Sequence, residues 1–194
     1  MRTNRLEAFS DGVIAIIITI MVLELKVPHD TSLHALLLMW PIFLSYFLSF
    51  AVVAIMWVNH HQLISLALRA SAGVLWTNNL LLLCMSLIPF VTAYMGENHG
   101  ASLPVACYGV VCVGCALGFW ALRTAITHQV SEHGGHHVHQ TKAQRKDLFS
   151  LILYAASIPL AFVSPMASYI IFFFVAASYF LPAGILENRP SRGS

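Results

Sequence analysis

Long apolar runs alternate with short polar segments along the whole chain. Six of these runs have roughly the 20 residues that a helix needs to cross a bilayer. The fifth and sixth runs are separated only by Ser164-Pro165-Met166, which predicts a tight hairpin. The pattern therefore predicts an all-α polytopic membrane protein with six transmembrane helices per chain. The predicted spans cover residues 6–25, 36–57, 71–94, 103–127, 148–164 and 167–186.

The composition agrees with this pattern, since 58% of the 194 residues are hydrophobic and only 9% are charged. Soluble domains carry about 25% charged residues, so this chain has too few to cover a water-facing surface. The lipid bilayer is therefore its expected solvent and partner. The net charge of +2, without a basic run interleaved with aromatics, gives no indication of nucleic-acid binding. We expect one domain over residues 1–189 and a disordered tail at 190–194.

The basic residues are distributed unevenly between the two sides of the membrane. With six spans, both termini and the loops after the second and fourth spans share one side. That side holds nine basic residues, whereas the other side holds only Lys26. Because basic loops stay in the cytoplasm, both termini are predicted to be cytoplasmic. The nine residues are Arg2, Arg5, Arg69, Arg123, Lys142, Arg145, Lys146, Arg189 and Arg192.

Polar side chains occur at the predicted cytoplasmic ends of the first three spans. Asp11 lies about one turn into the first span, His60 and His61 end the second, and Asn78 begins the third. Ionisable groups within a membrane are costly and usually functional. A hydrogen-bond network that holds the first helix is one interpretation, and a proton relay or metal site is the other. Adjacent histidines point about 100° apart, which disfavours chelation of one ion by this pair.

The first span is rich in β-branched residues and has a one-sided pattern. At about 100° per residue, Ile16, Ile20 and Leu23 share a stripe, with Thr19 beside it. Asp11 points to nearly the opposite side of the helix. The stripe faces either lipid and ordinary packing, or a symmetry axis between several copies of the chain.

The longest hydrophilic segment, about residues 128–147, follows the fourth span and is rich in histidine. We interpret it as a solvated linker, because Gly134-Gly135 makes it flexible and no fixed tetrahedral spacing is present. Divalent-metal binding or a response to pH is the alternative. The residues for that alternative are His133, His136, His137 and His139.

The segment Arg5-Leu6-Glu7-Ala8-Phe9-Ser10-Asp11 has the pattern Arg-x-x-x-Phe-Ser-Asp at the start of the first span. This resembles the signature of the transmembrane protein 175 family of potassium channels, particularly its short bacterial members. The similarity covers about the first half of the chain. Further matching positions are Gly12 to Ile16, Thr19, Leu23 to Pro28, Trp57, His60, His61, Trp76, Asn78 and Ile88-Pro89-Phe90.

The resemblance implies a homotetramer in the bacterial plasma (inner) membrane, with the first helix of each chain lining a central pore. It implies that Ile16 forms the constriction, that Thr19 supplies a hydroxyl layer, and that Ile20 and Leu23 form further apolar rings. Members lack a Thr-Val-Gly-Tyr-Gly carbonyl filter, and this chain has no such segment.

The resemblance also implies a network that supports the signature. Glu24, near the outer end of the first span, either concentrates cations at the pore mouth or pairs with Lys26. The implied supporting residues are Arg5, Phe9, Ser10, Asp11, His60 or His61, and Asn78.

These observations predict a potassium-permeable cation channel that conducts passively through a hydrophobic constriction, with no enzymatic activity and no cofactor beyond the permeant ion. Without close carbonyl coordination, only weak to moderate potassium selectivity is expected. The first alternative is a proton- or cation-coupled secondary transporter that uses Asp11 and the histidines of the second span. The second is a haem-binding oxidoreductase, disfavoured because no second histidine lies a few turns away within a span.

Overall fold

The computed structural model describes residues 3–132 and 140–180, and the regular structure within these ranges is entirely helical. Five helical segments are long and apolar enough to cross a membrane, and α8 is a shorter apolar helix. The prediction of an all-α polytopic membrane protein is therefore confirmed. The helices are α1 (Thr3–Leu23), α2 (Leu33–Leu38), α3 (Trp40–Ile64), α4 (Ala72–Ser86), α5 (Ile88–Glu97), α6 (Ser102–Glu132), α7 (Gln140–Val163) and α8 (Pro165–Phe180).

The third predicted span consists of two helices rather than one. α4 ends at Ser86 and α5 begins at Ile88, with Leu87 between them. Pro89 lies in the first turn of α5, where its missing N–H and fixed backbone angle are tolerated, whereas inside a continuous helix they would break the hydrogen-bond ladder. The third span thus changes direction at Leu87.

Two other helix boundaries differ from the prediction. The short helix α2 precedes the second span, and the side chain of Ser32 accepts a hydrogen bond from the backbone N–H of Ala35 at its start. α7 and α8 are separated by Ser164 alone, so the predicted hairpin is tighter than expected. The last part of the predicted span 167–186 and the tail 190–194 lie outside the described residues.

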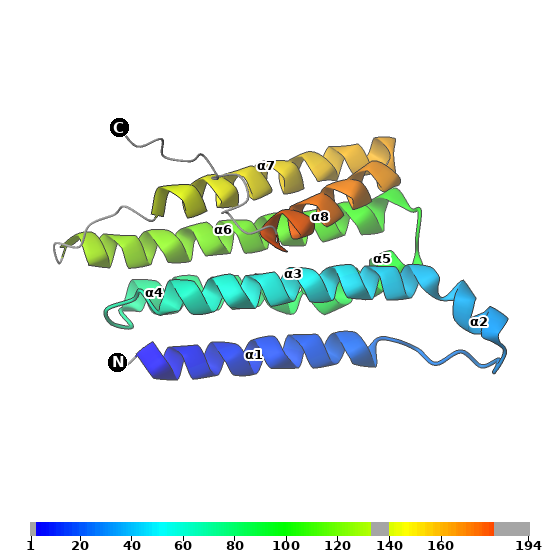
Figure 1. Ribbon diagram of the computed structural model, residues 1–194, viewed down its shortest axis with the longest axis horizontal. Helices are drawn as coiled ribbons and strands as arrows, with labels where there is room; N and C mark the ends of the chain where they lie inside the picture. Colours follow the sequence, from blue (N-terminus) through cyan, green and yellow to red (C-terminus); the bar gives the residue numbers. More distant parts are fainter. Residues whose placement is uncertain (1–2, 133–139, 181–194) are drawn as a thin grey trace, which may run out of the picture.

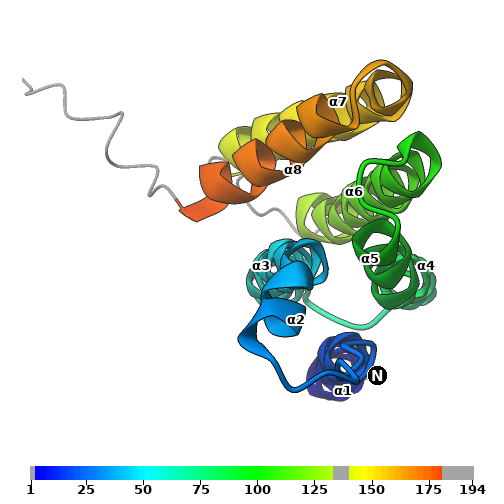
Figure 2. The same cartoon turned by 90° about the vertical axis from the view of Figure 1, so that its right-hand side faces the viewer.

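The helices form two groups that meet along α6. α1, α3 and the α4–α5 pair form one group, and α6, α7 and α8 form the other (Figures 1 and 2). Viewed along the bundle, α1 lies at the edge farthest from α7 (Figure 2). It packs against α3, α4 and α5. One face of α1 is therefore buried within its own chain, and the other is not.

Glycines let α6 approach its neighbours closely. A Cβ on Gly118 would lie 2.9 Å from the Cα of Leu81 in α4, and one on Gly109 would lie 2.8 Å from the hydroxyl of Ser157 in α7. Small residues at such contacts are typical of helix packing within membranes. They join the two helix groups into one bundle.

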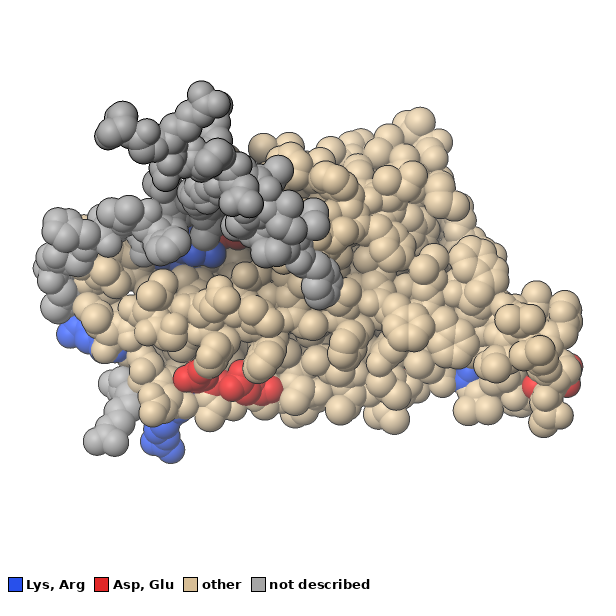
Figure 3. Space-filling model, viewed as in Figure 1, with Lys and Arg blue, Asp and Glu red and all other residues tan. Residues whose placement is uncertain are grey.

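Charged side chains are concentrated toward the two ends of the bundle. In Figure 3 they occupy the left part and the right tip of the visible face, and the surface between them is uncharged. α1 begins and α3 ends at the left end of Figure 1, which we call the N-terminal end of the bundle. The opposite end, where α1 leads into α2, is called the distal end.

Candidate functional site

The two faces of α1 differ sharply in their surroundings. One face is buried against α3, α4 and α5, and the opposite face is exposed in the single chain. Ile16 is 58% exposed and Leu23 is 79% exposed, and Thr19 and Ile20 are exposed beside them. The structure thus places all four residues of the predicted stripe on the free face. The buried residues of α1 are Leu6, Ser10, Ile14, Ile17 and Met21.

A buried network joins α1 to α3 and α4 near the N-terminal end. The Asn78 side-chain amide donates to the hydroxyl of Ser10 at 3.0 Å, and the Ser10 hydroxyl donates to the Leu6 carbonyl at 2.9 Å. His60 Nε2 lies 2.7 Å from the Asn78 side-chain oxygen. Ser10, His60 and Asn78 are all fully buried. Three helices are therefore held together by three buried polar side chains.

The geometry determines which nitrogen of His60 carries a proton. The Asn78 side-chain oxygen can only accept, so His60 Nε2 must be the donor. In the neutral ring Nδ1 is then an acceptor, and the described residues supply no partner for it. A buried imidazole in this arrangement suits a fixed structural contact, because a charged ring would need a partner for its second N–H as well.

Two further contacts tie α1 to α3 beside the buried network. The indole N–H of Trp57 donates to the carboxylate of Asp11 at 2.9 Å. His61 Nδ1 lies 2.7 Å from the carboxylate of Glu7, and both side chains are partly exposed. Sequence reasoning did not assign Glu7 to this site. Its position one turn before Asp11 was the available signal, since residues four apart share a helix face.

His60 and His61 have different environments, as their adjacent positions on α3 require. His60 is buried against Asn78, and His61 is directed to the carboxylate of Glu7. No group of three or more metal-ligating side chains occurs within residues 3–132 and 140–180. The histidines of the 133–139 tract, His133, His136, His137 and His139, lie outside the described residues.

Two signature residues lie apart from this network. Phe9 is 56% exposed and Arg5 is exposed as well, and neither has a hydrogen bond or ion pair to the described part of the chain. Within the single chain they do not join the supporting network, and their expected role there stays a prediction. The physical reason is helical phase, because Phe9 lies on the same free face as Ile16, two turns away.

At the distal end, Lys26 forms an ion pair with Glu97 at the end of α5. Its ion-pair partner in the structure is therefore Glu97, a residue that the sequence analysis did not consider. Glu97 ends α5 and approaches Lys26 only because the third span folds back along α1. Glu24 is exposed one residue beyond the end of α1, on the same side of the molecule as Leu23.

These features define a polytopic membrane protein whose first helix is held on one face by polar contacts and leaves an apolar face free. A model of the family described as endosomal/lysosomal potassium channel TMEM175 matches residues 5–89. A potassium channel of Chryseobacterium sp. (strain P1-3) is 39% identical over 190 residues, which is 97% of each chain. This chain therefore belongs to the TMEM175 family.

Two other relatives extend the comparison. The crystal structure of a lysosomal potassium-selective channel TMEM175 homolog from Chamaesiphon minutus is 32% identical and has a TM-score of 0.79, covering 96% of this chain and 98% of that one. The endosomal/lysosomal proton channel TMEM175 of the mouse is 33% identical over 145 residues, which is 65% of this chain and 29% of that protein. All three relatives bear the names of ion channels.

Proposed function

We propose that this protein is a potassium-permeable channel of the bacterial inner membrane, formed by four copies that each contribute α1 to a central pore. The observation that carries the proposal is the free apolar face of α1 on a helix at the edge of the bundle. A single stripe encloses a pore only when several copies are arranged about an axis. The polar contacts of Glu7, Ser10 and Asp11 on the opposite face hold each copy of the stripe in one orientation.

The side chain of Thr19 supports the role of a hydroxyl layer. Its hydroxyl donates to the carbonyl of Ile16 at 2.8 Å, within the helix itself. With the proton directed to the backbone, the oxygen lone pairs remain available on the exposed side. A ring of such oxygens next to the apolar Ile16 ring offers weak ligands to a partly dehydrated cation. Potassium loses its water more easily than sodium, so a modest preference for potassium is expected.

The distribution of charge supports both the proposed orientation of the chain in the membrane and the conduction of cations. Glu24 lies near the distal end of the stripe, where a ring of carboxylates would concentrate cations. Among the basic side chains that the structure describes, five lie toward the N-terminal end of the bundle and Lys26 lies at the distal end. By the positive-inside rule, the N-terminal end is cytoplasmic. The five are Arg5, Arg69, Arg123, Arg145 and Lys146.

The decisive experiment is ion flux into proteoliposomes, measured separately under potassium, sodium and proton gradients. Wild type is compared with Ile16→Ala and Ile16→Asn. A shorter or more polar side chain at the constriction lowers the free-energy barrier to its wetting. A barrier about 1.4 kcal/mol lower raises flux roughly tenfold. The matched control is Ile152 in α7, which is 57% exposed but lies across the molecule from α1, changed to the same two residues.

The possible outcomes separate the candidate functions. Uncoupled potassium flux that rises in the Ile16 variants and not in the Ile152 variants supports the pore. Flux that requires a counter-gradient and is indifferent to Ile16 contradicts it, and favours a coupled transporter built on Asp11 and the histidines of α3. Flux of protons alone would contradict potassium conduction while leaving α1 as the pore helix.

A further inference from the structure

A second polar site lies at the N-terminal end of the bundle, away from α1. A hollow of about 600 Å³ opens between the α3–α4 turn, the start of α4 and the C-terminal half of α6. We call it the Arg69 pocket. None of the described residues that line it is acidic. The lining residues that carry its chemistry are Arg69, Ser71, Gly73, Trp120, Thr124 and His128.

Arg69 has no acidic partner among the side chains that the structure describes. Three carboxylates near this end of the bundle already have partners: Glu7 with His61, Asp11 with Trp57, and Asp147 with Arg123. No ion pair that the described side chains form includes Arg69. A guanidinium in a hollow without acidic groups is complementary to an anion, and its planar fork suits a phosphate.

The hydroxyl of Ser71 is arranged to add a second donor. Its oxygen accepts from the side-chain amide of Gln129 and from the backbone N–H of Val74, the latter at 3.4 Å. Because both contacts use lone pairs, the hydroxyl proton remains available to a ligand. A charged and a neutral donor thus face the same hollow.

The pocket changes from polar to apolar along the bundle axis. Arg69 and Ser71 lie at its N-terminal end, at the level of Gln129, to which Ser71 is hydrogen-bonded. Trp120 lies nine residues earlier on α6, about 13 Å deeper by the helical rise, and is 59% exposed. Ala121 and Ala125 line the wall between the two levels. This order matches that of a phospholipid, whose phosphate lies outside its glycerol and acyl chains.

We propose that the Arg69 pocket binds an anionic phospholipid of the cytoplasmic leaflet, with the phosphate at Arg69 and Ser71 and the acyl chains against Trp120. Basic pockets on the cytoplasmic side of transmembrane bundles are a recurring site for such lipids. A free phosphate would use the two donors but would leave the apolar wall and the indole without a partner.

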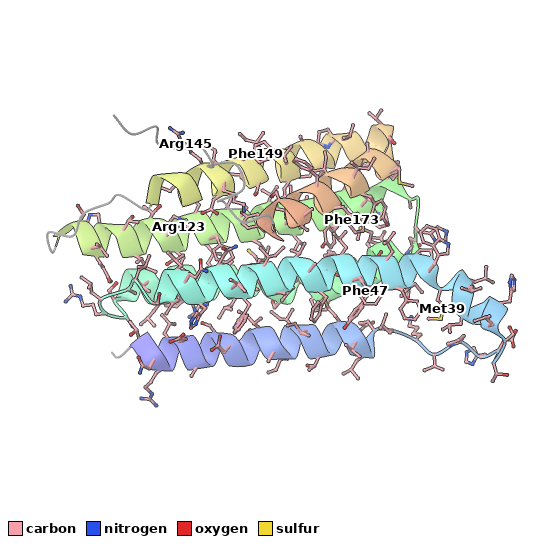
Figure 4. All side chains as sticks on the ribbon, in the orientation of Figure 1. Met39, Phe47, Arg123, Arg145, Phe149 and Phe173 are labelled. Atoms are coloured by element: carbon pink, nitrogen blue, oxygen red, sulfur yellow. The ribbon has the colours of Figure 1, made fainter. Side chains whose placement is uncertain are left out.

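The test compares wild type, Arg69→Gln and Gly73→Leu by native mass spectrometry, in mixed micelles of phosphatidylglycerol and phosphatidylcholine with identical acyl chains. Arg69→Gln removes the charge. Gly73→Leu fills the pocket without touching any charge, and a Cβ at Gly73 meets nothing within 4 Å, so the fold has room for it. The matched control is Arg145→Gln, an exposed arginine near the same end that points away from the helices (Figure 4).

We expect the binding ratio of phosphatidylglycerol to phosphatidylcholine to fall about tenfold in Arg69→Gln, as loss of a charge-assisted contact predicts, and similarly in Gly73→Leu. In Arg145→Gln the ratio should stay within about twofold of wild type. If the ratio fell equally in Arg145→Gln, the preference would come from general attraction of anionic lipid to the basic surface. That result would overturn the proposal. Unchanged ratios in both pocket variants would overturn it as well.

Inorganic phosphate, added as a competitor, distinguishes the two sources of the anion. Retention of phosphatidylglycerol in millimolar phosphate supports a lipid site, and its displacement identifies a site for free phosphate and contradicts the proposal. Because the readout is lipid binding and not ion flux, failure here is independent of whether α1 lines a pore.

Discussion

Polar side chains hold each of the two helix groups together, but by different means. In the group that contains α1, the fully buried contact is a neutral network of Ser10, His60 and Asn78, whereas its ion pairs are at least partly exposed. In the other group it is an ion pair, with Arg123 Nε of α6 donating to the Asp147 carboxylate of α7 at 2.8 Å. Both members of the pair are largely buried, and Arg123 lies in the C-terminal half of α6, toward the N-terminal end of the bundle (Figure 4).

The difference indicates different tasks for the two clusters. A neutral network tolerates small readjustments, since each hydrogen bond within a membrane is worth only about 0.6 kcal/mol on average. A buried ion pair has to stay intact, because loss of one partner leaves an uncompensated charge in the apolar interior. We therefore expect the ion pair to govern stability and the network to govern the orientation of α1.

The largest effect is expected from Asp147→Leu, which leaves Arg123 buried without its partner. Breaking a buried pair in this way costs about 3–5 kcal/mol. Thermal unfolding in detergent should shift to markedly lower temperature, with the ion selectivity of the surviving protein unchanged. The double variant with Arg123→Met should recover most of the loss, and a double variant as unstable as the single one would contradict the interpretation.

A smaller loss of stability and a larger functional effect are expected from Asn78→Leu. The substitution removes the acceptor of His60 and a partner of Ser10, at a cost of about 1–2 kcal/mol. Because α1 then loses its buried contact to α4, flux or selectivity in proteoliposomes should change.

The control for Asn78→Leu is Asn59→Leu, an amide on α3 for which the described residues supply no hydrogen bond. If both amide variants alter permeation equally, the network does not orient α1.

The smallest effect is expected from Lys26→Met at the distal end. Lys26 and Glu97 are both well exposed, and such pairs often contribute nothing measurable to stability. The unfolding temperature should stay within error of wild type, and Glu97→Gln should behave in the same way. A clear loss of stability in both variants would show that this pair holds the distal end of α1. The exposure of its side chains would then underestimate its contribution to stability.

Much of the fold could be predicted because lipid imposes a simple rule on the sequence. Every spanning segment must be an apolar helix of about 20 residues, so the runs could be counted directly. The faces of α1 followed from helical periodicity, which placed Ile16 and Asp11 on different sides. The break at Leu87 had a signal in Pro89, although a proline within a span does not by itself reveal whether the helix kinks or ends.

The partners of individual polar groups could not be predicted in the same way. Similar depth brought Asp11, the two histidines and Asn78 together in the prediction, and the family resemblance added Ser10. The approach of Glu97 to Lys26 depends on how α5 runs beside α1. The Arg123–Asp147 pair was missed because Arg123 was counted only as a basic residue of the cytoplasmic side. A base within a predicted span, next to an acid at the start of the following span, was the signal for it.

The sequence by itself determined the class of protein, the number and order of its apolar helices, and the two faces of α1, because these depend on local composition and on the fixed period of a helix. Only the tertiary structure decided which polar groups meet, that Phe9 lies on the free face outside the network, and that Arg69 faces a hollow beside Trp120. Those outcomes depend on the relative rotation and level of helices distant in the chain, which no local pattern specifies.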